Sequence, residues 1–448
     1  MSKIDWINIF KLNEVNQYCN SNDLSKLSMV CKVIRISSRS AHFNYFSLGK
    51  FMSCMEYKRC VIDLYRDYSY GITNQVVNHY KPINDDLLES KKQFKSDLGL
   101  YELTIDRSNL HCIFSYFYLV NEIPNVFQNL RILHLNKSVI IFDNFQAIMN
   151  KLNILEDLDL NNVYIFKRVN ESKDTDLPLT LKKLKLRFVS IDYFDETEDE
   201  VIFRKSSSLV ENYDTLELPS KNLPSLLLLR YEPNLSDYNG NNLLKFLKLN
   251  QNIKYLYIPQ LNSSPEIFNL VKTFKNLVKL EYSNLFVDYI INTGLINSSV
   301  GNNIKKLCVS FSKDSKCMKI IPQQFPNLTD LYIKNEVLEF NQLWPILPKL
   351  KKLKSLKLQN YEDLIQSKEL NSLIFSSLES IHLMIDKDIS VEALNFNINS
   401  FPKLKLIRFT HRCYPLNNLE SPKLPLEVKI NWKLIYFPSK VSFYRINQ

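Results

Sequence analysis

Leu155-Glu156-Asp157-Leu158-Asp159-Leu160 places three leucines in the order Leu-x-x-Leu-x-Leu, and this order returns along most of the chain. Nine further copies, some with another apolar residue in place of leucine, begin at Leu130, Leu181, Ile253, Leu277, Ile304, Leu328, Leu353, Leu378 and Leu404. Within each uninterrupted block, the central residues of successive copies lie 24 to 27 positions apart. Ten copies at so regular a spacing indicate an internal structural repeat.

The repeat length indicates the architecture, because leucine-rich repeats run from roughly 20 to 29 residues. Alternation of leucine with other residues predicts a short strand in each repeat, with every second side chain on the buried face. The rest of each repeat must return to start the next strand, and apolar residues at helical spacing indicate helices there. Two such sets are Phe145, Ile148, Met149 and Leu152, and Ile267, Leu270, Val271 and Phe274 after the capping pair Ser264-Pro265. The sequence therefore predicts an α/β fold, a leucine-rich-repeat solenoid with a curved parallel sheet inside and helices outside.

The repeat array is expected to span residues 98–440 with about 12 repeats, counting an early copy from Leu100 to Ile105. One stretch, 187–252, departs from the spacing, because its candidate central leucines, Leu216 and Leu229, are only 13 residues apart. One of the two is expected to belong to a repeat and the other to an insertion. The acidic run from Asp192 to Glu200 is expected to be a solvated loop.

Side chains between and beside the buried leucines are expected on the concave face of the sheet. Tyrosine and arginine are frequent anchors of protein interfaces, so this face predicts a binding site for another protein. The alternative is a solvated sheet face without a partner. The candidate partner-binding residues are Lys185, Arg187, Tyr255, Tyr257, Lys279, Glu281, Tyr332, Lys334, Lys357, His382 and Arg408.

Charge leaves a second class of partner open. The formal net charge is +10, from 57 Lys and Arg against 47 Asp and Glu, which permits contact with nucleic acid or acidic proteins without requiring either. A local lysine cluster is compatible with phosphate binding, but it favours the alternative of a solvated turn between helix and strand. Its members are Lys349, Lys351, Lys352, Lys354 and Lys357.

Catalytic signatures are missing from the sequence, which has no P-loop, GxGxxG, GxSxG or HExxH motif. The eight cysteines form no CxxC pair and no zinc-finger spacing, so free thiols in a reducing compartment are expected. No enzymatic activity, cofactor or metal is expected. The first ten residues lack the apolar core of a signal peptide, and no apolar stretch is long enough to cross a membrane. These features predict a cytoplasmic or nuclear protein that does not contact membranes.

Residues 1–48 do not follow the repeat and read as compact helices, with residues 49–97 as a linker or capping region before the array. The segment Asp23-Leu24-Ser25-Lys26-Leu27-Ser28-Met29-Val30-Cys31-Lys32, with Arg35 beyond it, resembles the second half of an F-box. The first half differs from that family, because Ile7–Leu12 lacks its usual Pro and Glu. The alternative is a helical cap for the repeats.

The resemblance implies a function for the whole chain. An F-box followed by leucine-rich repeats is similar to the substrate receptors of SCF-type ubiquitin ligases, which bind a Skp-type adaptor and a cullin-based ligase. Such a receptor holds a protein substrate while other subunits transfer ubiquitin. By position, the adaptor-binding residues would be Ile7, Leu12, Val15, Leu24, Leu27, Val30 and Cys31.

Overall fold

The chain consists of two compact units, Met1–Tyr238 (unit 1) and Asn239–Gln448 (unit 2). The computed structural model describes residues 45–47, 102–105, 129–136, 138–168, 175–194, 214–233, 240–258, 265–282, 303–310, 319, 321–334, 343, 345–359, 375–385, 401–411, 432–437 and 440–446. The expected F-box-like segment and the region 49–97 lie outside the described residues, apart from Tyr45–Ser47. Those three residues form a strand and join the sheet of unit 1.

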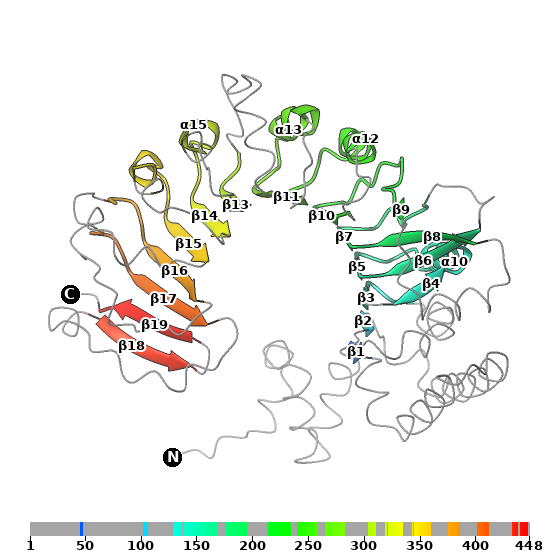
Figure 1. Cartoon of the computed structure of the whole chain (residues 1–448), viewed down its shortest axis with the longest axis horizontal. Coiled ribbons are helices and arrows are strands. Elements are labelled where there is room, and N and C mark those ends of the chain that lie inside the picture. Colours follow the sequence, from blue (N-terminus) through cyan, green and yellow to red (C-terminus); the bar gives the residue numbers. More distant parts are fainter. Residues whose placement is uncertain are drawn as a thin grey trace, which may run out of the picture. The chain divides into compact units, whose positions relative to one another are not determined.

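The main sheet of unit 1 is a parallel ladder of repeat strands (Figure 1). Neighbouring strands align their motif leucines, for example Leu133 with Leu158, and Leu158 with Leu184. Because each copy of the motif occupies the same place in the ladder, the predicted repeat is confirmed as a structural repeat. In spatial order the strands are β1 (Tyr45–Ser47), β2 (Glu102–Ile105), β3 (Ile132–Asn136), β5 (Asp157–Asn161), β7 (Lys183–Arg187) and β10 (Leu228–Glu232).

The described part of the irregular stretch contains one complete repeat strand. Leu229 lies in β10 and pairs with Leu184 of β7, so Leu229 is the repeat residue and Leu216 belongs to the inserted part. Asp192, expected in a solvated loop, is instead buried in a strand, β8 (Ser190–Phe194). The rest of that acidic run lies outside the described residues.

A second, smaller sheet forms the return segments of unit 1, where the sequence predicted helices. Strands β4 (Val139–Ile141), β6 (Tyr164–Arg168) and β8 are parallel, and β9 (Asp214–Thr215) pairs antiparallel with β8. The apolar residues Ile140, Ile165 and Ile191 align in register and are buried, so a second row of side chains closes the core opposite the leucines. Among the described return segments of unit 1, the predicted helix is present once, as α10 (Phe142–Lys151).

Two turns lead from the main sheet into this second sheet, and they occupy equivalent positions. Asn162 follows β5 and Phe188 follows β7, and both have φ of 52°, in the left-handed region. Each donates its backbone N–H to a carbonyl of the next main-sheet strand, Asn162 to Arg187 and Phe188 to Glu232, both at 2.8 Å. The strained backbone is thus held by contacts between repeats.

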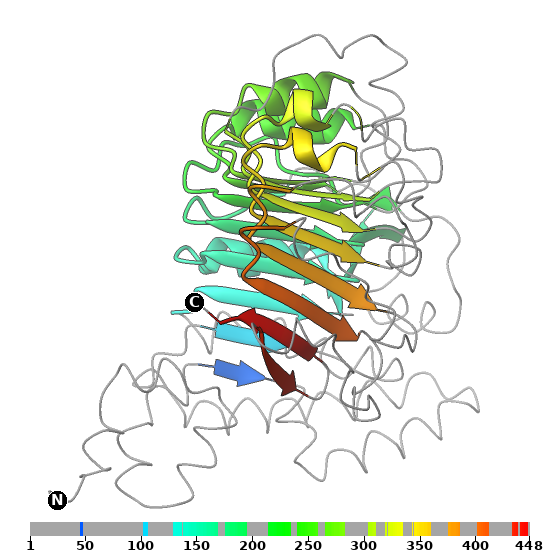
Figure 2. The same cartoon turned by 90° about the vertical axis from the view of Figure 1, so that its left-hand side faces the viewer.

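Unit 2 contains the more regular ladder, whose yellow to orange strands run side by side in Figure 2. Its parallel strands are β11 (Tyr255–Ile258), β12 (Lys279–Tyr282), β13 (Lys306–Ser310), β14 (Asp330–Lys334), β15 (Ser355–Gln359), β16 (Ser380–Ile385) and β17 (Leu406–His411). Two antiparallel strands end the ladder: β19 (Lys440–Arg445) pairs with β17, and β18 (Trp432–Phe437) pairs with β19. The hairpin covers the strand edge that β17 would otherwise expose.

Helices of unit 2 lie on one side of its strands (Figure 1). They are α12 (Asn241–Leu249), α13 (Pro265–Lys272), α15 (Ile321–Gln324) and the 3-10 helix η5 (Leu347–Lys349). The predicted helix around residues 267–274 is confirmed as α13, whose Ile267 and Val271 are buried beneath it. The motif leucines point to the same core, and Leu256, Leu331 and Leu356 are no more than 2% exposed.

A recurring phenylalanine turn enters several strands of unit 2, and the sequence reading missed it. In each turn, the first leucine of the motif donates its N–H to the carbonyl of a phenylalanine three residues earlier: Leu277 to Phe274, Leu328 to Phe325, Leu378 to Phe375 and Leu404 to Phe401. All four phenylalanine side chains are buried. The rings of Phe375 and Phe401 stack with centroids 4.7 Å apart, so aromatic packing links neighbouring repeats.

Candidate functional site

Each main sheet has two faces because successive side chains along a strand point in opposite directions. One face carries the buried leucines. We call the other the polar face. In unit 2, strand register sets one residue from each strand side by side along this face, and we call this set the central row. It consists of Tyr257, Glu281, Cys308, Tyr332, Lys357, His382 and Arg408.

Tyr332 is the best-connected side chain of the central row. Its hydroxyl donates toward Oε1 of Gln359 at 3.2 Å and lies 3.5 Å from the sulfur of Met384. The ammonium of Lys357 lies 4.3 Å from the centroid of the Tyr332 ring, within the range of a cation–π contact. A similar pair occurs at the other end of the row, where Lys279 lies 4.7 Å from the centroid of the Tyr257 ring. Two lysines are therefore positioned by tyrosine rings.

Glu281 and Lys334 form an ion pair across the intervening strand β13. Desolvation works to lower the pKa of Lys334, but the neighbouring Cys308 sulfur and the Glu281 carboxylate outweigh it and raise this pKa. Glu281 is 7% exposed and Cys308 is 2% exposed, so two residues expected on an accessible face are covered. Residues of the row can be buried by a longer side chain that lies beside the row and reaches across it, as Lys334 does.

The Cys308 thiol is poorly reactive. Burial, together with the negative charge of Glu281, raises its pKa to about 12. Since the thiolate is the reactive form, the thiol at neutral pH is a weak nucleophile and a weak metal ligand. A catalytic role for this cysteine finds no support in its surroundings.

Lys357 and Arg408 form the basic part of the central row. Desolvation and the positive charges of Lys334, Lys279 and Arg408 lower the pKa of Lys357, against an opposing effect of Cys308. The buried Nε of Arg408 has no hydrogen-bond partner among the described residues. Between them, His382 Nε2 lies 2.8 Å from the Thr410 hydroxyl. Lys357 and Arg408 thus place positive charge on β15 and β17, on either side of His382 in the row.

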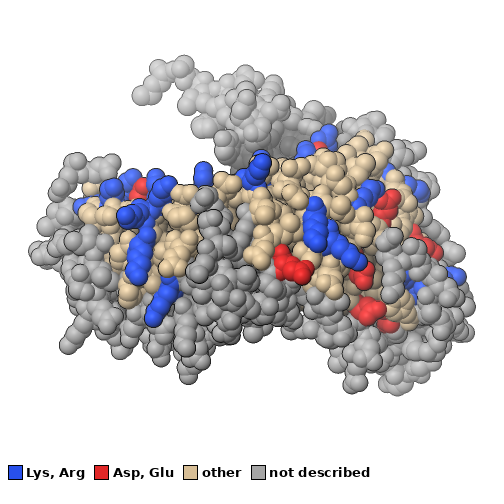
Figure 3. Space-filling view, turned by 90° about the horizontal axis from the view of Figure 1, so that it is seen from above, with Lys and Arg blue, Asp and Glu red and all other residues tan. Residues whose placement is uncertain are grey.

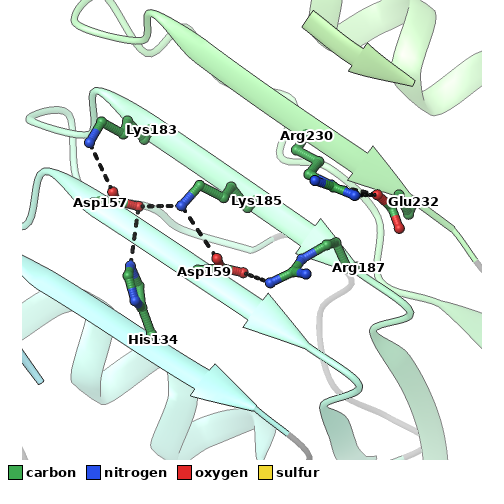
Figure 4. Close-up of polar contacts among 8 residues, drawn as sticks. All are labelled: His134, Asp157, Asp159, Lys183, Lys185, Arg187, Arg230 and Glu232. Atoms are coloured by element: carbon green, nitrogen blue, oxygen red, sulfur yellow. Dashed lines mark hydrogen bonds and ion pairs between the residues drawn. The ribbon is translucent and has the colours of Figure 1, made fainter. Parts of the chain in front are cut away.

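The polar face of unit 1 holds a self-neutralising network around two aspartates (Figure 4). Asp157 lies 3.2 Å from the ammonium of Lys183 and 3.5 Å from that of Lys185. Asp159 lies 3.3 Å from Lys185 and 2.9 Å from Arg187. The predicted site residues Lys185 and Arg187 are therefore engaged with carboxylates of the neighbouring strand, which makes them poor candidates for binding a partner's anions.

His134 completes this network from strand β3. Its Nε2 lies 3.7 Å from Asp157 Oδ1, a distance too long for a hydrogen bond. Burial works to raise the pKa of Asp157, but the contact with His134 and the charge of Lys185 outweigh burial, so this pKa lies below its usual value. Asp157 is 5% exposed and remains a carboxylate at neutral pH.

The lysine cluster 349–357 is divided by the fold. Lys354 pairs with Glu379 at 3.2 Å, and Lys352 donates to Asn327 at 2.6 Å. Of the five lysines, Lys357 alone belongs to the central row. Figure 3 shows basic side chains next to acidic ones at several places on the described part of the face that it draws. The solvated turn is therefore the better interpretation for the other four.

Glutamates bridge neighbouring repeats at one further motif position. Glu156 lies between Arg131 and Lys182, at 3.0 and 2.8 Å, and Glu379 lies between Lys354 and Lys405, at 3.2 and 2.9 Å. Hydrogen bonds from Lys182 and Lys405 lower the pKa values of Glu156 and Glu379, respectively. These ion pairs support the register of the strands. They also leave few lysines at this motif position without a neighbouring carboxylate.

Most of the predicted partner-binding residues of unit 2 come together on its polar face. Tyr257, Glu281, Tyr332, Lys357, His382 and Arg408 share the central row, with Tyr255, Lys279 and Lys334 beside it. Sequence reading missed Gln359, Met384 and Thr410, which contact the row. The signal for them was available, since each directly follows the last apolar residue of its motif copy. The predicted adaptor-binding residues lie outside the described residues.

Neither a metal site nor a membrane span is found in the described part of the chain. No group of three or more His, Cys, Asp or Glu side chains there is arranged to hold an ion. None of the helices among these residues is both long and apolar enough to cross a bilayer.

Comparisons with known proteins add little to this site. No protein-family model matches the chain, and no curated protein matches it. Among solved structures, it is similar to a TLR13–ssRNA13 complex, with 16% sequence identity, a TM-score of 0.29 and coverage of 70% of this chain. The match spans 39% of the TLR13 chain.

Proposed function

We propose that this chain is a non-catalytic interaction scaffold that binds a partner protein on the polar face of unit 2. The observation that carries the proposal is the central row. In this row, strand register aligns Tyr332 of β14, Lys357 of β15 and Arg408 of β17 on one face. Tyrosine and arginine dominate the binding energy of many protein interfaces. A sheet positions such side chains rigidly, which reduces the entropy lost on binding.

The finer proposal is a substrate receptor of an SCF-type ubiquitin ligase. It is supported by the F-box-like residues from Asp23 to Arg35 ahead of the repeats. In this role the N-terminal segment would dock a Skp-type adaptor, and the repeats would hold the substrate near the transfer machinery. The contribution of this chain would be proximity alone. A scaffold without a ligase, in which the N-terminal segment caps the repeats, is the competing proposal.

A photo-crosslinking experiment tests the polar face as a binding surface. Replace Tyr255, which is 38% exposed beside the central row, with a photoreactive phenylalanine analogue in the full chain expressed in cells. Leu249, which is 46% exposed at the end of α12, is the matched control away from this face. We expect a discrete protein adduct from position 255 and none from 249. Equal labelling at both positions, or none at either, would refute binding on the polar face.

Co-purification with a Skp-type adaptor tests the ligase proposal. We expect the wild-type chain to retain the adaptor and the Leu24→Asp/Val30→Asp double variant to lose it. A Lys349→Gln variant, altered in an exposed turn of unit 2, should retain it. The ligase proposal fails if the wild type binds no adaptor or if the double variant binds as well as the wild type.

A further inference from the structure

Lys357 and Arg408 differ from most cations of the polar faces because no carboxylate of the described residues pairs with either of them. Among the ion pairs between described residues, Lys334 is joined to Glu281, Lys185 and Arg187 to Asp159, and Arg230 to Glu232. None includes Lys357 or Arg408. Instead, Lys357 lies against the Tyr332 ring, and the Nε of Arg408 is buried without a hydrogen bond in the described structure. A buried Nε–H group without an acceptor is costly unless a ligand accepts its hydrogen bond.

Neighbouring positive charges add to the free-energy cost of placing Lys357 and Arg408 here. Lys334, Lys279 and Arg408 all act on Lys357 as neighbouring cations. The nearest described carboxylate of the row, Glu281, is already committed to Lys334. An incoming anion would relieve the repulsion and would be favoured further by the partly desolvated setting. The basic end of the central row is therefore complementary to negative charge.

The spacing between the two cations restricts the kind of anion. Lys357 pairs with His382, and His382 pairs with Arg408, so the two cations stand two strands apart. Strands in a sheet are separated by about 4.8 Å, which gives about 9.6 Å between the two positions. In a polyproline II segment, residues i and i+3 lie on the same side at about 9.3 Å. In a β-strand, same-side residues i and i+2 lie only about 6.8 Å apart.

We propose that β15 to β17 bind an extended acidic peptide segment, in which carboxylates three residues apart meet Lys357 and Arg408. The ring of Tyr332 lies beside Lys357 at one end of this path, and the ring of His382 lies between the two cations. The inference rests on the proposed function and names the chemistry of its partner. A nucleic acid is a poorer occupant, because Glu281 and Asp330 lie on the same face and a phosphate backbone needs a longer run of cations.

Fluorescence anisotropy with designed peptides tests the inference on the full chain. The probe is a labelled ten-residue peptide of proline and serine with two glutamates three positions apart. One comparison peptide has the glutamates two positions apart, and another has glutamine in their place. We expect the first peptide to bind at 50 mM salt and to weaken as salt rises. It should bind several-fold more tightly than the second, and the third should not bind.

Charge variants assign the binding to the two cations. Lys357→Gln and Arg408→Gln should each weaken binding of the acidic peptide about tenfold. The matched control is Lys349→Gln, in the exposed η5 turn, which should leave binding unchanged. A Lys357→Glu/Arg408→Glu variant should instead bind a peptide with lysines three positions apart. Circular dichroism and Tm identify any variant that fails to fold, in which case the single glutamine variants decide.

Three results would overturn the inference. They are no binding of the acidic peptide to the wild type at low salt, equal binding of the two glutamate spacings, and tighter binding of an oligonucleotide that survives both glutamine substitutions. Each leaves the photo-crosslink from position 255 unaffected, because that experiment assumes nothing about the partner's charge. Failure of the inference and failure of the proposed function are therefore distinguishable.

Discussion

At the scale of single residues, the polar faces of the two units use the same kinds of side chain differently. In unit 1, carboxylates of β5 neutralise Lys185 and Arg187 of β7. In unit 2, the comparable strands carry Tyr332, Lys357 and Arg408, while the carboxylate of Glu281 is committed to Lys334 and that of Asp330 to Lys306. The distribution of acidic residues along the motif, more than the total charge, thus distinguishes a closed network from a surface able to accept an anion.

Removing the Glu281 charge is expected to destabilise unit 2. In Glu281→Gln, Lys334 loses its ion pair while remaining partly buried, which should lower the free energy of unfolding by about 1–2 kcal/mol after allowance for solvent screening. Urea denaturation measures the change. Glu379→Gln is the control, because its carboxylate bridges exposed lysines, and its effect should be clearly smaller. An equal effect of the two substitutions would contradict this account.

The depressed pKa of Asp157 predicts a pH-dependent contribution to stability. A carboxyl whose pKa is lower in the folded state stabilises that state above its unfolded pKa of about 3.9, and the contribution disappears as pH falls through the folded value. Wild type should therefore exceed Asp157→Asn in Tm at pH 6, and the difference should shrink below about pH 4. The control Asp176→Asn alters an exposed carboxylate and should show a small difference throughout. A Tm difference for Asp157→Asn that grows toward low pH would show the opposite sign.

At the scale of elements, the strands could be predicted and many of the return segments could not. The leucines that define a strand, such as Leu331 and Leu356, recur at fixed spacing because each must fill the same place in the core. The return segments are held by whatever fills the remaining space, so Tyr164–Arg168 forms a strand in unit 1, although helices were expected in the return segments. Side-chain reach is also invisible in sequence. Lys334 and Glu281 are 53 residues apart and meet across β13.

Leu356 tests the contribution of one strand to its neighbours. Leu356→Asp buries a charge without a partner between Leu331 and Ile381, and it should cost at least about 3 kcal/mol of unfolding free energy. Ser355→Asp places the same charge on the half-exposed opposite face and should cost far less. Circular dichroism during urea denaturation compares the two variants. Similar midpoints would mean that the strand is not packed as described.

At the scale of the whole molecule, stability in a repeat stack comes from contacts between neighbouring repeats, so the end of a ladder needs protection. In unit 2 the β18–β19 hairpin provides it. Phe443 of β19 is buried and meets Phe409 of β17 edge to face, with centroids 5.7 Å apart. The last repeat is thus closed by a change of strand direction.

Loosening this hairpin is expected to promote self-association. Phe443→Ala removes the ring that holds β19 against β17, so the edge of β17 should become available to other chains. Sedimentation velocity should show oligomers that increase with protein concentration. Tyr444→Ala, at a more exposed position of the same strand, should remain unchanged. A Phe443→Ala chain that stays monomeric at all concentrations would argue that the hairpin does not protect the edge.

The covering of Cys308 by the Glu281–Lys334 pair has a consequence for measuring local opening. Its thiol can be alkylated only when β12 to β14 separate far enough to admit reagent and water. The labelling rate of this one cysteine, followed by mass spectrometry of its peptide, therefore reports how often the middle of unit 2 opens under native conditions. A ligand seated on the neighbouring strands should slow that rate in proportion to its occupancy, without any label on the ligand.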